Sequence, residues 1–230
     1  MMVPAVLSLL FALTSTVATA QGVAAEPVAA KSITAVPWFD GSYNGALSAA
    51  RKKDCAVVLV FAPEWSSYSE QLRHETLQDE GVAAALQSSV CLDVDPDPVL
   101  GAQVVQLHNV EMFPTLAFLT SKGAAEDRIV GLIPAQALVR ELARIAAGDF
   151  TVSDFRAQQK AAPSDLTLRN DLAEKLVWVG DLPRAGKLFD SIRRDDPEGS
   201  SLASARLAMQ DVISLDGGGP TLLQIGTSHR

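Results

Sequence analysis

The sequence predicts an α/β domain followed by a small module made only of helices. Over the first two thirds of the chain, short apolar runs of strand length alternate with segments of helical periodicity, which indicates a sheet with helices on its faces. From about residue 166 to 214, helical patterns continue without a further strand signal. The 230 residues, 48% of them hydrophobic, suffice for one full domain and a smaller second one.

Helix and strand alternate in the first part of the α/β region. A helix is expected within 37–54, where alanines form an apolar face and basic residues in the last turn favour the helix dipole. The continuous, valine-rich run 56-AVVLVF-61 is typical of a buried strand. A helical region over 67–87, with a break near Gly81, leads to the second strand, 88-SSVCLDVD-95.

The second part of this region ends in a hairpin and a helix. A short helix at about 98–107 precedes a strand within 110-VEMFPTLAFLT-120, and the turn 121-SKG-123 leads to the return strand 127-DRIVG-131. The last helix, 134-PAQALVRELARIAAG-148, has proline at its start and glycine at its end. Because strands separated by helices are joined by right-handed crossovers, we expect a parallel core with an antiparallel hairpin at its edge, and so a mixed sheet.

The stretch 64-EWSSYSE-70 connects the first strand to the next helix. Further features accompany it in order along the chain: Trp38, Tyr43, Ala46 and Ala50 before the first strand, 75-ETLQDEGVAAAL-86 before the second, and Phe113-Pro114-Thr115 before the third. Together they resemble the thioredoxin-like superfamily, most closely its secreted or periplasmic branch, over residues 36–148. The resemblance implies a thioredoxin-like fold, a central mixed sheet flanked by helices, with a cis-proline turn at Pro114.

The resemblance also shows what the motif lacks. In the family, Trp-Cys-x-x-Cys opens a helix, and its first thiolate attacks a disulfide. Here Ser66 and Ser69 occupy both cysteine positions, and a hydroxyl neither ionises near neutrality nor forms a disulfide. Val60 replaces the buried aspartate that handles protons for the second thiol in many thioredoxins. By contrast, Trp65 and Pro114, which shape the peptide groove in the family, are present.

We therefore expect no redox catalysis at this motif and no cofactor, which leaves two interpretations open. In the first, Ser66 is a helix cap, Trp65 an aromatic at the edge of the core, and Pro114 a turn residue. In the second, the four residues Trp65, Ser66, Ser69 and Pro114 line a groove that still binds extended peptide without chemistry.

Cys55 and Cys91 are the only cysteines, and they lie 36 positions apart at or near the starts of two predicted strands. Those strands are neighbours in the family, so a structural disulfide and two buried free thiols both remain open. A direct bridge between adjacent parallel strands is geometrically awkward. The alternative function uses these thiols: a thiol-disulfide oxidoreductase or redox-linked protein of the cell envelope that works through Cys55 and Cys91.

The spacing of the residues indicates neither a serine hydrolase site nor a metal site. A nucleophilic Ser66 would need a base within about 3 Å, and His74 lies about 12 Å away along the same helix. The scattered histidines and cysteines show no ligand spacing, so no metal is expected. The stretch 93-DVDPDP-98 has Pro98 and Val104 where a calcium loop needs glycine and glutamate, which favours a solvated strand end.

Residues 166–214 predict a tetratricopeptide-like (TPR-like) helical module. The positions that match the repeat pattern are Leu172, Ala173, Leu176, Gly180, Ala185, Phe189 and Pro197, and a further helix follows at about 201–214. Arg169 stands where the repeat has an aromatic residue, and a plain helical hairpin remains the alternative. One repeat cannot bury its apolar surface alone, so we expect the module to pack on the first domain, on a partner or on another copy.

The chain termini and connection complete the predicted organisation. Residues 1–20 are apolar and end in 18-ATA-20, which predicts a signal peptide; an uncleaved membrane anchor is the alternative. A flexible leader over 21–35, a polar linker over 149–165 that is helical in part, and a flexible tail over 215–230 are also expected.

The predicted function is binding without catalysis. A net charge of −8 and the absence of a long basic run disfavour nucleic-acid binding. The predicted signal peptide indicates an exported, periplasmic or secreted protein. The resemblance to thioredoxin-like domains joined to such repeats implies that it binds peptides, unfolded segments or a protein partner in a chaperone-like or scaffold role.

Overall fold

The structure is a computed structural model that describes residues 35–215, with side chains as far as residue 209. The predicted signal peptide over 1–20, nearly all of the predicted leader over 21–35, and nearly all of the predicted tail over 215–230 lie outside the described residues. Within residues 35–215, no helix is both long enough and apolar enough to cross a bilayer.

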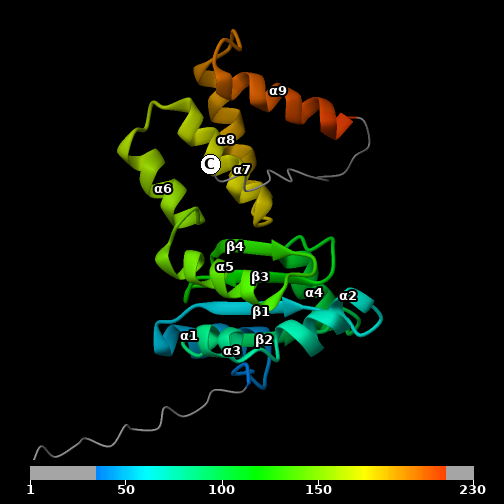
Figure 1. Ribbon diagram of the computed structural model, residues 1–230. Coiled ribbons are helices and arrows are strands. Elements are labelled where there is room, and N and C mark those ends of the chain that lie inside the picture. Colours follow the sequence, from blue (N-terminus) through cyan, green and yellow to red (C-terminus); the bar gives the residue numbers. More distant parts are fainter. Residues whose placement is uncertain (1–34, 216–230) are drawn as a thin grey trace, which may run out of the picture. The chain divides into compact units, whose positions relative to one another are not determined.

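A four-stranded mixed sheet forms the centre of the first domain, in the order β2-β1-β3-β4 (Figure 1). The strands are β1 (Val57–Phe61), β2 (Val90–Val94), β3 (Thr115–Leu119) and β4 (Ala125–Val130). β1 and β2 are parallel, whereas β3 is antiparallel to both β1 and β4. The predicted mixed sheet is confirmed.

The expected parallel core is wrong in one respect, because β3 runs against β1 rather than with it. β2 ends at Val94 opposite Phe61, and β3 begins at Thr115 opposite the same Phe61. The connection that contains α4 (Val99–Leu107) therefore leaves and re-enters the sheet at one end, so the chain can only run back along β1.

Alternate residues of β1 point into two separate cores. Val58 and Val60 pack with residues of α3 (Glu80–Leu86) and α5 (Ala135–Ala147), while Val57, Leu59 and Phe61 pack with residues of α1 (Tyr43–Lys53). Every residue of β1 is buried, as its continuous apolar sequence predicts.

The predicted helix over 67–87 is divided into three pieces. These are α2 (Ser67–Gln71), the π-helical turn η1 (Leu72–Thr76) and α3. The break falls just before Asp79, whose side chain accepts hydrogen bonds from the backbone N–H groups of Gly81 and Val82 and so starts α3.

Four further helices follow the first domain: α6 (Val152–Ala161), α7 (Leu166–Trp178), α8 (Leu182–Asp195) and α9 (Leu202–Leu215). α6 lies within the predicted linker over 149–165 and buries Val152. α7 and α8 form the predicted helical hairpin, joined at Gly180. Four of the residues that match the repeat pattern are buried: Leu172, Ala173, Leu176 and Ala185.

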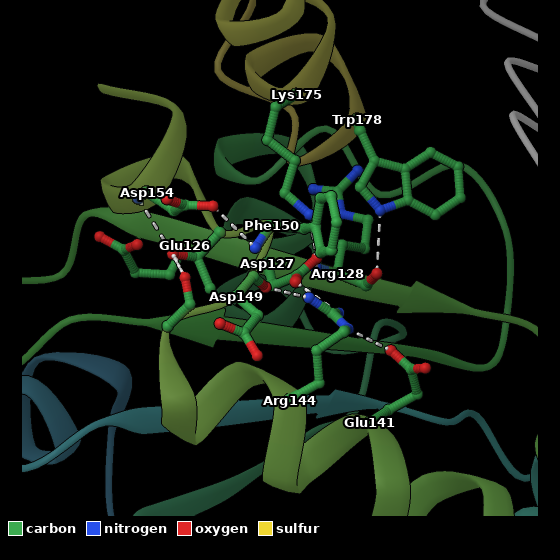
Figure 2. Close-up of polar contacts among 12 residues, drawn as sticks. Glu126, Asp127, Arg128, Glu141, Arg144, Asp149, Phe150, Asp154, Lys175 and Trp178 are labelled. Atoms are coloured by element: carbon green, nitrogen blue, oxygen red, sulfur yellow. Dashed lines mark hydrogen bonds and ion pairs between the residues drawn. The ribbon is translucent and has the colours of Figure 1, made fainter. Parts of the chain in front are cut away.

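A buried ionic cluster joins α7 to strand β4 and helix α5 (Figure 2). The carboxylate of Asp127, which is 2% exposed, lies 2.5 Å from Nζ of Lys175 and 2.7 Å from Nη2 of Arg144. Figure 2 shows the two cations approaching Asp127 from opposite sides. The helical module therefore packs on the first domain, which was one of the three expected surfaces.

Beside this cluster, the end of α7 is held by Arg128 of β4. Nη2 of Arg128 donates to the carbonyl of Val179 at 2.8 Å and to the carbonyl of His108, and these residues are the C-caps of α7 and α4. A cation at two helix C-termini is favourable because both helix dipoles are negative there. Nε1 of Trp178 also donates to the carbonyl of Arg128 at 2.9 Å.

Candidate functional site

The sequence 62-APEWS-66 forms the turn from the end of β1 into α2, at the end of the sheet where the β1 arrow points (Figure 1). Ser66 has an extended backbone, and its Oγ accepts a hydrogen bond from the N–H of Ser69 at 3.4 Å. Ser66 is thus the N-cap of α2, which confirms the first interpretation of this hydroxyl.

Ser69, which the resemblance places at the second cysteine position, is fully buried. Its Oγ has no hydrogen-bond partner among the described residues. The expectation that Ser69 lines a groove is therefore wrong, because helix α2 turns this side chain inward and away from solvent. Trp65 and Ser66 remain at the surface.

Trp65 is 64% exposed, yet its ring is fixed on two sides. The indole Nε1 lies 3.2 Å from both carboxylate oxygens of Asp97. The ring also makes a perpendicular contact with Phe113, with 5.7 Å between the centroids. Trp65 therefore brings together three connections of the fold: β1 to α2, β2 to α4, and α4 to β3.

The Phe113–Pro114 peptide bond is cis, as the resemblance predicted. Pro114 is buried, and its carbonyl accepts from the N–H of Gly131 at 2.7 Å. Because Phe113 touches Trp65, the cis-proline turn and the serine motif lie side by side. A ligand at Trp65 would meet Phe113 before it met Pro114, whose side chain is covered.

Asp97 lies at this surface, and Arg73 is a nearby cation with carboxylates of its own. The guanidinium of Arg73 binds both oxygens of Asp93, at 2.6 and 2.7 Å, and also the carbonyl of Ala62. Its pKa is raised, first by the hydrogen bond to Asp93 and further by the charges of Asp93, Glu64 and Asp95, although burial opposes this. Sequence reasoning missed Asp97 and the partner of Arg73, Asp93. Both aspartates lie in the stretch 93-DVDPDP-98, which indicated only the end of a strand.

No serine–histidine pair occurs among the described residues. Nε2 of His108 lies 3.1 Å from the hydroxyl of Tyr43, inside the α1 side of the first domain, and His74 is exposed on η1. Burial, and to a lesser extent the charge of Arg128, lowers the pKa of His108 to about 4. His229 lies outside the described residues.

Cys55 and Cys91 are free thiols, so of the two alternatives that the sequence left open the disulfide is not formed; Cys91 is buried and Cys55 is partly buried. Cys91 pairs with Val58 in the parallel ladder, which places Cys55 three positions away along the strand direction. That offset is about 10 Å, too far for a disulfide. Burial, together with the charge of Cys55, raises the pKa of the Cys91 thiol to about 12, so a thiolate does not form near neutrality.

Among the described residues, neither a metal site nor one of the two hollows is found at the serine motif. Within that part of the chain, no group of three or more His, Cys, Asp or Glu side chains could hold a metal ion. One hollow of about 490 Å³ lies between α4 and the start of α1, and another of about 490 Å³ lies beside Cys55 and α5. Neither of these two hollows is lined by Trp65 or Ser66, and Trp65 lies exposed at the surface.

Comparison with known proteins identifies the first domain. Residues 43–146 match the family model of the thioredoxin-like domain. A thioredoxin from Thermus thermophilus is 26% identical, and the match covers 49% of this chain and 88% of that chain with a TM-score of 0.45. The match to the DsbH oxidoreductase is 18% identical, covers 52% and 89% of the two chains, and has a TM-score of 0.41.

Thioredoxin O2 from Arabidopsis thaliana is 23% identical, with 50% of this chain and 94% of that chain covered and a TM-score of 0.38. Among curated proteins, no sequence matches the chain significantly. The described residues thus contain a thioredoxin-like domain with a mixed sheet flanked by helices, followed by a mainly helical C-terminal region.

Proposed function

We propose that this chain binds extended or unfolded polypeptide through the surface around Trp65, without thiol-disulfide chemistry. The observation that carries the proposal is the state of Trp65, which is 64% exposed and still held by Asp97 and Phe113. A large aromatic ring that is both exposed and held in place suits a binding contact, because little conformational entropy is lost when a ligand covers it.

Neighbouring residues extend this apolar surface. Tyr68 lies three positions after Trp65 and is 63% exposed, and Met112 precedes Phe113 and is 59% exposed. We refer to Trp65, Tyr68, Met112 and Phe113 as the Trp65 surface. Large exposed apolar patches mark interaction sites, and Trp65 and Phe113 are in contact within this one.

The absence of thiol chemistry follows from the two serines. A catalytic pair needs a first sulfur with a lowered pKa and a second sulfur that resolves the mixed disulfide. The Oγ atoms of Ser66 and Ser69 supply neither, and the first is engaged as a helix cap. The alternative oxidoreductase would have to act through Cys55, since Cys91 is fully buried.

The helical region supports a scaffold role beside peptide binding. We interpret α7 and α8 as a single tetratricopeptide-like repeat, with small residues Ala173 and Ala185 in the seam and Gly180 at the turn. Arg169, at the aromatic position of the repeat, instead binds Asp195 across the hairpin at 2.5 Å. Together with the apolar N-terminal sequence, these features favour an exported chaperone-like or scaffold protein.

Substitution of Trp65 tests the proposal. A permanently unfolded polypeptide with alkylated cysteines is titrated into the purified protein by calorimetry. Trp65→Ala should weaken binding about tenfold or more, as for a central aromatic contact. Trp38→Ala is the matched control: Trp38 is 43% exposed and lies beside Cys91 at the other end of the sheet. Equal affinities for the two variants, or no binding by the unsubstituted protein, would refute the proposal.

A further inference from the structure

The net charge of the chain is concentrated in the segment that forms the candidate site. Between residues 61 and 115 there is one basic side chain, Arg73, and the rest of the chain has equal numbers of acidic and basic side chains. The acidic residues of this segment are Glu64, Glu70, Glu75, Asp79, Glu80, Asp93, Asp95, Asp97 and Glu111. The entire formal charge of −8 therefore comes from this segment.

Several of these carboxylates lie directly at the Trp65 surface. Asp97 accepts from the indole of Trp65, and Glu64 is the preceding residue in the chain. Asp95 accepts from the backbone N–H of Asp97 at 3.1 Å. Asp97 thus contacts Trp65 directly and Asp95 contacts Asp97, while Glu64 and Asp95 both lie within electrostatic reach of the nearby Arg73.

Arg73 offsets only part of the charge of these carboxylates. Both of its terminal nitrogens bind Asp93, and its Nε and one Nη bind the carbonyl of Ala62. This single cation therefore faces four carboxylates, Asp93, Glu64, Asp95 and Asp97, and the excess of negative charge gives a negative potential at the Trp65 surface. Such a potential favours a cationic ligand and raises its rate of association.

We propose that the Trp65 surface selects polypeptide segments in which a lysine or arginine stands beside an apolar residue; this inference rests on the peptide-binding function proposed above. The cation packs on the exposed indole of Trp65, between Asp97 and Glu64. Cations are attracted to the face of a tryptophan ring, and carboxylates beside the ring strengthen that attraction. The neighbouring apolar side chain covers Phe113 and Met112.

The negative charge of the Trp65 surface favours basic peptide segments over other classes of ligand. Nucleic acids and anionic membranes would be repelled by the same carboxylates. Acidic or neutral peptides would keep the apolar contacts but lose the attraction, so they should bind more weakly. Selectivity among peptides is therefore the property to measure.

A matched set of short extended peptides provides the test, measured by calorimetry at low salt and at about 0.5 M salt, where charges are strongly screened. The peptides share one apolar sequence and differ only in a central pair of residues, which is two lysines, two glutamines or two glutamates. We expect the lysine peptide to bind about tenfold more tightly than the glutamine peptide at low salt, and we expect this preference to shrink at high salt.

Charge-neutral variants test the named carboxylates. The triple variant Glu64→Gln, Asp95→Asn, Asp97→Asn keeps side-chain oxygens that can accept from the indole and the backbone, and it should reduce the lysine preference to about twofold or less. Asp190→Asn removes one negative charge on α8, outside the Trp65 surface, and should leave the preference unchanged.

The outcomes separate the two proposals. If the glutamine peptide binds as tightly as the lysine peptide at low salt, or if the triple variant keeps the full preference, the selectivity inference is overturned while peptide binding stands. If none of the peptides binds and the unfolded polypeptide does not bind either, both proposals are wrong.

Discussion

At the residue scale, the two serines of the motif have opposite surroundings. Ser66 caps α2 through Oγ, whereas the Oγ of Ser69 is buried without a partner in the described structure. The cap was foreseeable from the sequence, because serine before a helical segment is a common start signal. The burial of Ser69 was not, because the resemblance alone does not say which side chains of the motif turn inward.

This difference predicts that substitution by alanine affects stability differently at the two serines. Ser66→Ala should lower the free energy of unfolding by about 1 kcal/mol, because the N–H of Ser69 loses its acceptor. Ser69→Ala should leave it unchanged or raise it by up to about 1 kcal/mol, because a buried hydroxyl without a partner is removed. Urea unfolding of both variants gives the two values; a loss at Ser69 as large as that at Ser66 would contradict the structure.

His108 predicts a pH dependence of stability. Its pKa is lowered to about 4 in the folded protein, from 6.5 when exposed, by burial and by the charge of Arg128. Between these two pH values the unfolded state takes up a proton and the folded state does not, so stability falls as the pH drops from about 6.5 to 4. The loss is on the order of 3 kcal/mol.

The measurement is the unfolding free energy of the protein and of His108→Gln at several pH values in that window. Glutamine can keep a hydrogen bond to Tyr43 but does not titrate, so its curve should be flatter than that of the unsubstituted protein. His74→Gln is the control, because His74 is exposed. Parallel curves for all three proteins would show that His108 does not titrate as proposed.

The partners of Trp65 also belong to this scale, and the sequence could not identify them. Asp97 lies 32 positions from Trp65 and Phe113 lies 48 positions away. Both residues are in connections between elements, where periodicity gives no information on direction. Trp65 and the cis turn at Pro114 were predictable only because the resemblance supplied the spatial relation between them.

At the scale of elements, local patterns predicted the helices and strands well. The valine-rich run of β1, the proline and glycine that bound α5, and the hairpin of α7 and α8 all appear where the sequence placed them. The direction of β3 was missed, because hydrophobic patterning does not record at which end of the sheet a connection re-enters.

Gly180, between α7 and α8, is required by a close contact. It has a φ of +84°, and a Cβ there would lie 2.4 Å from the carbonyl oxygen of His108 and 2.6 Å from Nη2 of Arg128. Gly180→Ala should therefore combine backbone strain with displacement of α7 from the first domain, and we expect it to destabilise by at least about 2 kcal/mol.

Gly199 is the matched control for this substitution. Its φ is +66°, but a Cβ there would have nothing within 4 Å. Gly199→Ala should show only the strain of a left-handed alanine, about 1 kcal/mol. Thermal unfolding of both variants gives the comparison, and equal losses would mean that the contact with His108 is not formed in solution.

At the scale of the whole described molecule, the ionic cluster of Asp127 joins the helical region to the thioredoxin-like domain (Figure 2). The sequence predicted that the helical module needs a surface to pack on, but not which one. Asp127, Arg144 and Lys175 come from three different elements. Burial lowers the pKa of Lys175, and the charge of Asp127 opposes this, which is why the ammonium can remain inside the contact.

Asp127→Asn should therefore lower the free energy of unfolding by weakening the contact between the helical region and the first domain. It leaves the largely buried cations of Lys175 and Arg144 without their common carboxylate, and breaking a buried ion pair in this way destabilises by about 3 kcal/mol or more. Asp190→Asn removes an exposed partner of Arg193 and should change stability within error. Equal stability of the two variants in urea would contradict the proposed junction.

The central claim for the whole molecule is that it binds polypeptide at the Trp65 surface without thiol-disulfide catalysis at Ser66 and Ser69. The most direct test is the turbidity of insulin while dithiothreitol reduces it. A thiol-disulfide catalyst makes the reduced chains precipitate earlier, whereas a polypeptide binder delays their precipitation. We predict a later onset and lower turbidity with the added protein, and loss of this effect in Trp65→Ala. An earlier onset than with dithiothreitol alone, abolished by Cys55→Ser, would contradict the account.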